Sequence, residues 1–154
     1  MGKTIVVKIK CALRKWLSAK VIPLLVINSW RIRLYRLCGY NIDKKVFIGM
    51  RCYLDDVAPE MLTIKKNATI SYGVFFACHG EKQDHEPIVI EEGAYIGVRA
   101  TIISKNAEKD KKGVRIGRNS IVGACTLVNR DIPEGTTAVG VPCRILHTGT
   151  TRSF

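Results

Sequence analysis

A branched aliphatic residue or a phenylalanine recurs at every sixth position in four stretches between residues 42 and 128. The members are Ile42, Ile48 and Leu54; Ile64, Ile70 and Phe76; Ile90, Ile96 and Ile102; and Ile116, Val122 and Val128. A small residue stands four places after eight of them: Val46, Cys52, Ala68, Val74, Ala94, Ala100, Ser120 and Thr126. A period of six matches neither a helix nor a single strand and is typical of a parallel β-helix built from hexapeptides. The repeat therefore predicts an all-β solenoid of about four coils.

The repeat is interrupted three times, always after the third hexapeptide of a coil. An unbroken repeat needs steps of six residues, but the steps that follow positions 54, 76 and 102 are 10, 14 and 14 residues. Because three hexapeptides complete one triangular coil, all three insertions leave from the same corner of the prism. In repeat proteins, insertions on one face often form the binding face. The middle insertion, from Ala77 to Pro87, contains His79 and His85, two of the three histidines of the chain.

The N-terminal 40 residues differ from the rest in pattern and charge. Residues 1–45 hold 11 Lys and Arg against one acid, whereas the remaining 109 residues hold 14 against 12. Apolar residues at helical spacing predict one or two basic amphipathic helices over residues 4–37, broken at Pro23 and ended by Gly39. Two roles are open for them: a cap over the first coil, or a contact with an anionic membrane surface. The longest apolar run, residues 21–27, is too short to span a membrane.

The nearly neutral repeat region argues against a nucleic-acid groove. The six cysteines include no CxxC pair, so we expect a reduced, cytosolic protein without a thiol metal site. Cys52 and Cys125 fall within the hexapeptides and are expected to act as small hydrophobic residues. No metal cofactor is expected.

Two segments carry a resemblance to a known family. They are Pro87-Ile-Val-Ile-Glu-Glu-Gly-Ala-Tyr-Ile-Gly97 and Asn129-Arg-Asp-Ile-Pro-Glu-Gly-Thr-Thr-Ala-Val-Gly-Val-Pro-Cys-Arg-Ile145. Residues 40–147 resemble the hexapeptide-repeat acyltransferases, in the branch of the maltose, galactoside, serine and polysaccharide O-acetyltransferases. The resemblance implies a left-handed β-helix over residues 41–147, between a helical cap at 1–40 and a tail at 148–154. It also implies a homotrimer that holds acetyl-CoA in the groove between neighbouring prisms.

The resemblance further implies that His79 is the general base of the reaction. This histidine stands shortly after the third hexapeptide of coil two and upstream of the first of the two segments. The unperturbed pKa of histidine suits proton abstraction from a hydroxyl near neutrality. His85 is a reserve base or a substrate contact. Asp84, Glu81 and Glu86 are candidates for orienting the histidine ring or binding sugar hydroxyls.

The same resemblance assigns roles to other positions. The backbone N–H of Val98 is expected to meet the oxyanion, although the side-chain hydroxyl found there in close relatives is missing. Three small residues are expected to keep the wall low beside the pantetheine arm of CoA: Gly97, Gly123 and Ala124. Arg144 lies where the family places a basic residue near the nucleotide. The lysine-rich insertion from Ser104 to Gly113 is expected either to cover the cofactor or to remain a solvated loop.

These residues predict an O-acetyltransferase that moves the acetyl group of acetyl-CoA directly to a hydroxyl of a sugar or cell-envelope polysaccharide. The short N-terminal segment favours this acceptor over serine, because serine O-acetyltransferases usually carry a long helical domain. A catalytically inactive β-helix scaffold is a further alternative. A γ-class carbonic anhydrase is disfavoured. Its three zinc histidines are spread over successive coils, whereas two of the three histidines here, His79 and His85, lie in one insertion. The expected location is the cytoplasm, in solution or at the membrane surface through residues 1–37.

Overall fold

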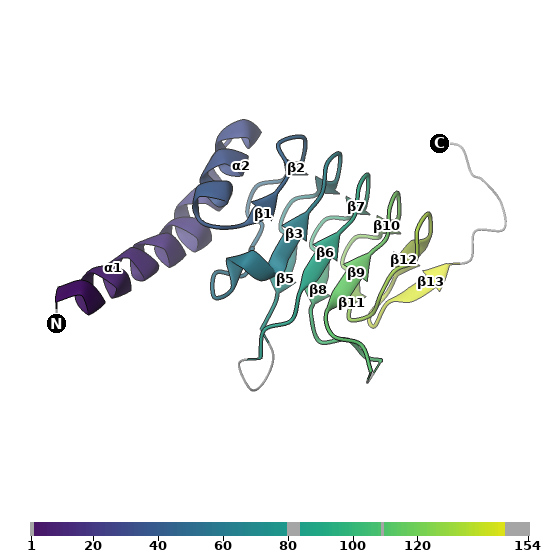
Figure 1. The fold of residues 1–154 in the computed structure, drawn as a ribbon. Coiled ribbons are helices and arrows are strands. Elements are labelled where there is room, and N and C mark those ends of the chain that lie inside the picture. Colours follow the sequence, from purple (N-terminus) through teal and green to yellow (C-terminus); the bar gives the residue numbers. More distant parts are fainter. Residues whose placement is uncertain (1, 80–83, 109, 147–154) are drawn as a thin grey trace.

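The computed structural model describes residues 2–79, 84–108 and 110–146, with side chains from residue 9 onwards. Its body is a prism of three sheets, which the chain visits in turn (Figure 1). The first sheet contains β1 (Asn41–Ile42), β3 (Leu62–Ile64), β6 (Ile88–Ile90) and β9 (Val114–Ile116). The second contains β2 (Phe47–Ile48), β4 (Thr69–Ile70), β7 (Tyr95–Ile96), β10 (Ile121–Val122), β12 (Thr137–Val139) and β13 (Arg144–Leu146). The third contains β5 (Phe75–Ala77), β8 (Thr101–Ile103) and β11 (Leu127–Val128).

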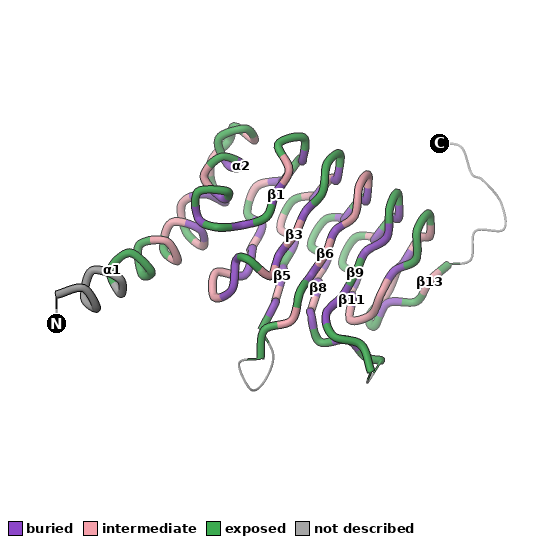
Figure 2. Tube along the Cα trace, in the orientation of Figure 1, coloured by how far each residue is buried: buried purple, intermediate pink, exposed green. Residues whose placement is uncertain are grey.

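The sixth-position residues fill the interior of this prism. All twelve are at most 4% exposed, and the eight small residues are at most 3% exposed, so buried segments recur along every coil (Figure 2). The paired strands are parallel except β13, which runs antiparallel to β12. There are three complete coils, and the third side of the first coil pairs only through Tyr53. The predicted parallel solenoid is confirmed.

Left-handed backbone occurs at the corners of the coils. The third residue after an inward aliphatic has φ between 51° and 70° at Arg51, Asn67, Gly73, Gly93, Arg99, Asn119 and Cys125. Glycine and asparagine adopt this conformation readily, but the stacking of coils also imposes it on two arginines and a cysteine. The expectation that Cys125 is a small core residue is therefore wrong, because its position is a turn and the residue is exposed. Cys52 is buried as expected.

Helices precede the first coil. They are α1 (Gly2–Trp16), a π-helical turn η1 (Leu17–Val21), a 3-10 turn η2 (Ile22–Leu24) and α2 (Asn28–Leu37). The predicted break occurs at Pro23, and Gly39 follows α2 with a φ of 100°, as a helix-ending glycine does. The inner side of this segment joins the solenoid core through Ile22, Ile32 and Tyr35.

The helical segment supplies hydrogen bonds that no preceding coil can give to the first coil. The side chain of Asn28 donates to the Val46 carbonyl and accepts from the Ile48 N–H, both at 3.0 Å, as a neighbouring strand would. The buried guanidinium of Arg31 donates to the Ile48 carbonyl from Nη2 at 2.6 Å and from Nε at 3.0 Å. The predicted cap is confirmed, and its role is to satisfy the polar edge as well as to cover the apolar interior.

All three insertions leave from the corner where the third sheet passes to the first. The first insertion contains the 3-10 turn η3 (Pro59–Met61), the second joins β5 to β6, and the third joins β8 to β9. The Cys78 N–H of the second insertion donates to Oδ2 of Asp55 in the first at 2.7 Å. The Gly113 N–H of the third donates to Oε2 of Glu86 in the second at 3.1 Å. The insertions therefore form one connected layer over this corner, as the spacing predicted.

Candidate active site

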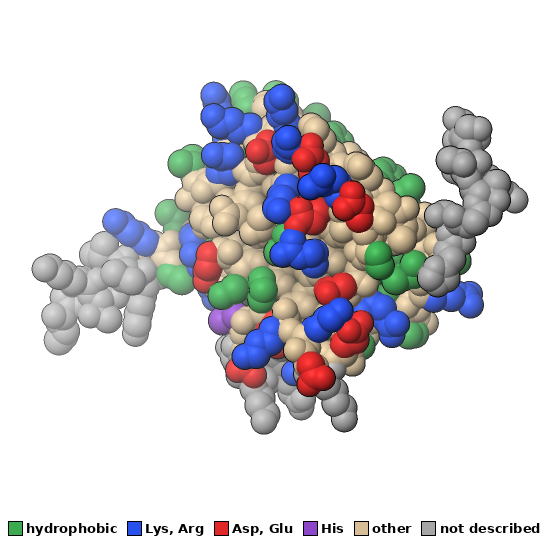
Figure 3. Space-filling view, turned by 45° about the vertical axis from the view of Figure 1, so that its right-hand side comes forward, with side chains coloured by type: hydrophobic (Ala, Val, Ile, Leu, Met, Phe, Trp, Pro, Cys, Tyr) green, Lys and Arg blue, Asp and Glu red, His purple; other side chains and the backbone are tan. Residues whose placement is uncertain are grey.

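His79 lies just after β5, and its ring is paired with a carboxylate from the coil below. Nδ1 of His79 is 2.5 Å from Oδ2 of Asp55. These residues are 24 positions apart in the chain, but Tyr53 of coil one pairs in parallel with Phe75 of coil two, which brings the following residues together. The side chain of His79 is 41% exposed and that of Asp55 is fully buried. Histidine is visible at the molecular surface beside hydrophobic side chains (Figure 3).

Asp55 accepts hydrogen bonds at both carboxylate oxygens. Oδ1 accepts from the Val57 N–H at 2.9 Å, and Oδ2 accepts from the Cys78 N–H at 2.7 Å. Burial alone would raise the pKa of Asp55, but the hydrogen bonds from Val57, His79 and Cys78 outweigh burial and lower the pKa below its ordinary value. Asp55 is therefore an ionised carboxylate at neutral pH, held in one position.

A carboxylate on Nδ1 determines what the other ring nitrogen can do. Nδ1 carries the proton that it donates to Asp55, so Nε2 of the neutral ring carries the free lone pair. Such a ring can accept a proton from a hydroxyl, and the buried charge stabilises the imidazolium that forms. The pair of His79 and Asp55 is thus suited to general-base catalysis.

The carboxylate that holds the ring is none of the three that the sequence singled out. Asp84 is exposed, Glu86 is bonded to the third insertion, and Glu81 lies outside the described residues. Asp55 belongs to the first insertion. Its signal in the sequence is its place directly after the third hexapeptide of coil one, which coil stacking aligns with the start of the second insertion.

The second insertion returns beside its own beginning. His85 forms an antiparallel backbone bridge with His79, and the Glu86 N–H donates to the Cys78 carbonyl at 3.0 Å. Asp84 and His85 are both exposed next to this bridge. The fold therefore gathers the predicted base and both predicted substrate residues at one corner, where substrate contact remains a prediction for Asp84 and His85.

The predicted oxyanion and cofactor residues gather at a different corner, between the second and third sheets. Val98 is on the turn from β7 to β8, and its backbone N–H has no hydrogen-bond acceptor among the described residues. A Cβ on Gly97 would lie 2.5 Å from the Ala124 nitrogen and 2.7 Å from the Gly123 carbonyl carbon. Packing between coils therefore explains the glycine at position 97, and a role beside the cofactor stays a prediction for all three small residues.

Arg144 lies near the same corner at the far end of the solenoid. It is exposed on β13 and pairs with Val139 of β12, and a Cβ on Gly123 would lie 2.9 Å from Cγ1 of Val139. In the lysine-rich third insertion, Nζ of Lys111 lies 2.9 Å from Glu108 and 3.3 Å from Asp131. Acids of the same chain therefore already pair with this lysine.

One chain does not bring the predicted base and oxyanion donor together. β5 and β8 are paired in register, and His79 follows the carboxyl end of β5 while Val98 precedes the amino end of β8. The length of a three-residue strand, about 10 Å, therefore separates them along the third sheet. Within one chain, a base on the attacking hydroxyl and a donor to the oxyanion of the same carbonyl group cannot lie this far apart.

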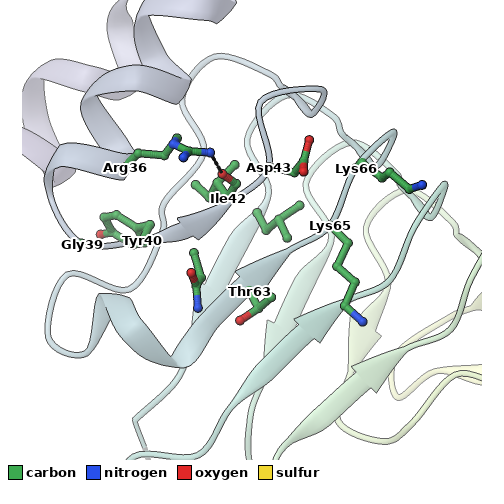
Figure 4. A pocket seen from close by; sticks show the side chains of 10 residues that line it. Arg36, Gly39, Tyr40, Ile42, Asp43, Thr63, Lys65 and Lys66 are labelled. Carbon is green, nitrogen blue, oxygen red and sulfur yellow. Dashed lines mark hydrogen bonds between the residues drawn. The ribbon is translucent and has the colours of Figure 1, made fainter.

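A cavity of about 700 Å³ lies elsewhere, between α2 and the first sheet (Figure 4). Arg36, Asp43, Lys65 and Lys66 are among its lining residues, and Arg36 donates to the Ile42 carbonyl at 2.7 Å. None of the predicted site residues lines this cavity. The candidate chemistry is therefore at the corners of the prism rather than in this hollow.

Within residues 2–79, 84–108 and 110–146, no group of three or more His, Cys, Asp or Glu side chains is arranged to hold a metal ion. In the same part of the chain, no helix is both long and apolar enough to cross a membrane. The third histidine, His147, lies outside the described residues.

The chain is similar in sequence to proteins named as acetyltransferases. It is 28% identical over 134 residues to the Bacillus subtilis protein "Putative acetyltransferase YvoF", which covers 84% of this chain and 72% of that protein. It is 31% identical over 122 residues to the galactoside O-acetyltransferase of Escherichia coli, which covers 70% of this chain. The chain spans only 56% of the length of that enzyme. No protein-family model matches the chain.

The fold is similar to that of a hexapeptide-repeat-containing acetyltransferase from Vibrio cholerae, solved in complex with acetyl-coenzyme A. The TM-score is 0.65 at 23% identity, over 97% of this chain and 90% of that chain. The chain therefore shares the solenoid fold of this hexapeptide-repeat protein, and its sequence relatives are named as acetyltransferases. These findings support the resemblance of the sequence to the hexapeptide-repeat acetyltransferases, and the O-acetyltransferase branch stays a prediction.

Proposed function

We propose that this protein is an acetyl-CoA-dependent O-acetyltransferase that acts on a hydroxyl of a sugar or cell-envelope polysaccharide. The observation that carries the proposal is the outward-facing His79 ring held by the buried carboxylate of Asp55. Acetyl transfer to a hydroxyl needs a positioned base of this kind. The similarity to a galactoside O-acetyltransferase supports a sugar acceptor, and a cytoplasmic location fits the use of acetyl-CoA.

In the proposed reaction, Nε2 of His79 takes the proton of the acceptor hydroxyl as its oxygen attacks the thioester carbonyl. Asp55 stabilises the imidazolium, and the backbone N–H of Val98 donates to the oxyanion of the tetrahedral intermediate. The carbon–sulfur bond then breaks, and the imidazolium returns its proton to the CoA thiolate. The acetyl group passes directly to the acceptor, so no covalent enzyme intermediate is needed.

A homotrimer would complete this site. His79 and Val98 are at opposite ends of the third sheet of one chain. A single chain therefore has the proposed base at one corner and the proposed oxyanion donor at another. In a ring with three-fold symmetry, the His79 corner of one chain faces the Val98 corner of the next, and three equivalent sites result. Gly97, Gly123 and Arg144 would then border acetyl-CoA from the second chain.

The test is thiol release from acetyl-CoA with purified protein and a panel of acceptors: free hexoses, nucleotide sugars, lipid-linked sugars and L-serine. We expect release that depends on a sugar acceptor, with an acetylated sugar found by mass spectrometry. His79→Ala should lower kcat by about 10²–10⁴ while calorimetry shows unchanged acetyl-CoA binding. His85→Ala is the matched control and should have a smaller effect on kcat.

Two results would overturn the proposal. One is the absence of any acetyl-CoA binding, which would leave a scaffold without activity. The other is unchanged turnover of a genuine acceptor by the His79→Ala variant, which would show that His79 is not the general base. Transfer to L-serine but to no sugar would contradict the sugar acceptor alone, and would make the protein a serine O-acetyltransferase with the same base and cofactor.

A further inference from the structure

Large apolar side chains are unusually exposed in the helical cap. Ile9, Leu13 and Trp16 are on α1, Val26 and Ile27 lie just before α2, and Trp30 is in the first turn of α2. Each of the six is about half exposed or more, from 49% to 79%. The contacts of the cap with the first coil come from other residues: Ile22, Ile32, Tyr35 and the hydrogen bonds of Arg31. The exposed apolar side chains are therefore not needed for capping.

From Ile9 to Trp16, the part of α1 whose side chains the structure describes, no residue is buried. It projects away from the coils (Figure 1), and the element that it contacts most is η1, the next segment of the chain. Ile9, Leu13 and Trp16 are spaced i, i+4 and i+7, so they form one stripe along the helix. A helix of about this length is only marginally stable in water without a surface that covers its apolar stripe.

The positive charge of the N-terminal segment indicates what kind of surface can cover the apolar stripe. Residues 1–40 contain nine Lys and Arg and no Asp or Glu. At about 100° per residue, Lys10 and Arg14 flank the stripe on one side and Lys15 flanks it on the other. Cations on both sides of an apolar stripe fit a surface that is apolar inside and anionic at its boundary. A second copy of the same segment would bring no acid to meet these cations.

We propose that α1 and the segment through Trp30 lie in the plane of an anionic lipid bilayer and hold the acetyltransferase domain at its surface. The apolar stripe enters the boundary between headgroups and acyl chains, and the flanking lysines and arginines meet lipid phosphates. Trp16 and Trp30 suit this boundary, because the indole ring is apolar with one polar N–H. This binding does not depend on the acetyl transfer, so the two proposals can fail separately.

The first measurement is co-sedimentation of the full chain with vesicles. We expect binding to phosphatidylcholine vesicles that contain phosphatidylglycerol, weaker binding to phosphatidylcholine alone, and release by added salt. Trp16 and Trp30 are the two tryptophans of the chain, so their fluorescence should shift to the blue on binding. The variants Trp16→Phe and Trp30→Phe assign the shift to each residue. No binding to either vesicle, or equal binding to both, would overturn the proposal.

Leu13→Glu places a charge in the stripe and should weaken vesicle binding at least about tenfold. Leu146→Glu is the matched control, because Leu146 is also exposed but lies on β13 at the opposite end of the solenoid (Figure 1), and it should bind like the wild type. Circular dichroism checks that both variants keep the fold. If Leu13→Glu instead dissociates an oligomer in lipid-free solution, a second copy covers this surface and the proposal is wrong.

Discussion

Asp55 and His79 are neighbours because successive coils stack in register, with about 4.8 Å between paired strands. The last hexapeptide of each coil ends at the same corner, so the residues that follow it in coil one and coil two face each other. The buried carboxylate accepts hydrogen bonds from the Val57 N–H of the first insertion, the Cys78 N–H of the second insertion and the His79 ring, so both insertions hold the ring in place. An acid from the same exposed loop as His79 would hold the ring less rigidly, because exposed loops move more than stacked coils.

We predict that Asp55→Asn lowers kcat by about 10²–10⁴ and leaves the KM for acetyl-CoA nearly unchanged. The amide cannot stabilise the imidazolium, and it also favours the wrong tautomer of His79. Asp56→Asn is the control, because Asp56 accepts from the Tyr53 hydroxyl at 2.6 Å and is not bonded to His79. Steady-state kinetics of both variants decides between positioning and general destabilisation, and equal losses in the two would contradict the assigned role.

The lowered pKa of Asp55 also predicts a pH-dependent stability. An unfolded Asp has a pKa of about 3.9, and the folded value lies below it. The stabilisation from ionised Asp55 is therefore complete above about pH 4 and is lost as the pH falls through the folded value. Urea unfolding should show Asp55→Asn less stable than the wild type near pH 7, with a smaller difference near pH 3. A difference that does not change with pH would argue against this linkage.

At the scale of elements, close approach between coils requires glycine directly after the inward aliphatic residue at Gly49, Gly97 and Gly117. At Gly97 a Cβ would lie 2.5 Å from a backbone nitrogen of the next coil, and backbone cannot rotate away as a side chain can. The cap is the second element that sets stability, because its side chains replace a missing coil. Short strands of two or three residues are thus held by their neighbours rather than by their own length.

Gly97→Ala should lower the free energy of unfolding by about 3 kcal/mol or more, since it forces two coils apart. Gly135→Ala is the matched control. Gly135 has a φ of 67° and nothing within 4 Å of a built Cβ, so alanine there costs only the left-handed backbone, about 1–2 kcal/mol. Urea unfolding followed by circular dichroism compares the two, and equal losses would show that coil spacing adapts.

Arg31→Met tests the cap. The variant leaves the carbonyls of Ile48 and Val26 without their buried donor, which should cost about 2–4 kcal/mol of unfolding free energy. Arg33→Met removes an equal charge from an exposed position and should change stability by less than about 0.5 kcal/mol. The same unfolding measurement applies, and similar losses for both would mean that charge rather than capping matters.

At the scale of the whole molecule, stability should fall from the middle of the solenoid towards its ends. Each coil contacts only its neighbours, so an inner coil is supported from two sides and an outer one from a single side. The first coil is supported by the cap and the last by β13, whereas α1 has little support from the solenoid. The molecule is therefore a rigid prism with a weakly supported helix at one end.

Hydrogen exchange followed by mass spectrometry should resolve this gradient. Amides of β4 and β7 in the middle coils should exchange most slowly, and those of α1 and β13 most quickly in the absence of lipid. Anionic vesicles should slow exchange in α1 while leaving the middle coils unchanged. Protection of α1 in lipid-free solution equal to that of β7 would contradict the gradient.

The amino-acid sequence by itself determined the solenoid, the residues inside it, the corner of the insertions and the helical cap. These follow from periodicity, because burial of every sixth residue is repeated along the chain and needs no knowledge of distant contacts. The prediction of His79 as the base came from the resemblance to the acyltransferases, in which the catalytic histidine stands at the matching place after the third hexapeptide. Cys125 was misassigned because a place within a hexapeptide does not by itself mean burial: Cys125 stands three residues after Val122, at a corner, whereas the buried Cys52 stands four residues after Ile48.

The tertiary structure decided which residues meet. Asp55 reaches His79 only through the stacking of two coils, and the place of Asp55 after coil one becomes informative only once that stacking is known. The placement of His79 and Val98 at opposite ends of one sheet follows from strand register, a property of the assembled coils. Periodicity determines whether a side chain points into or out of the solenoid. The pairing of coils, which joins residues 24 positions apart, determines what that side chain contacts. The candidate chemistry depends on these contacts.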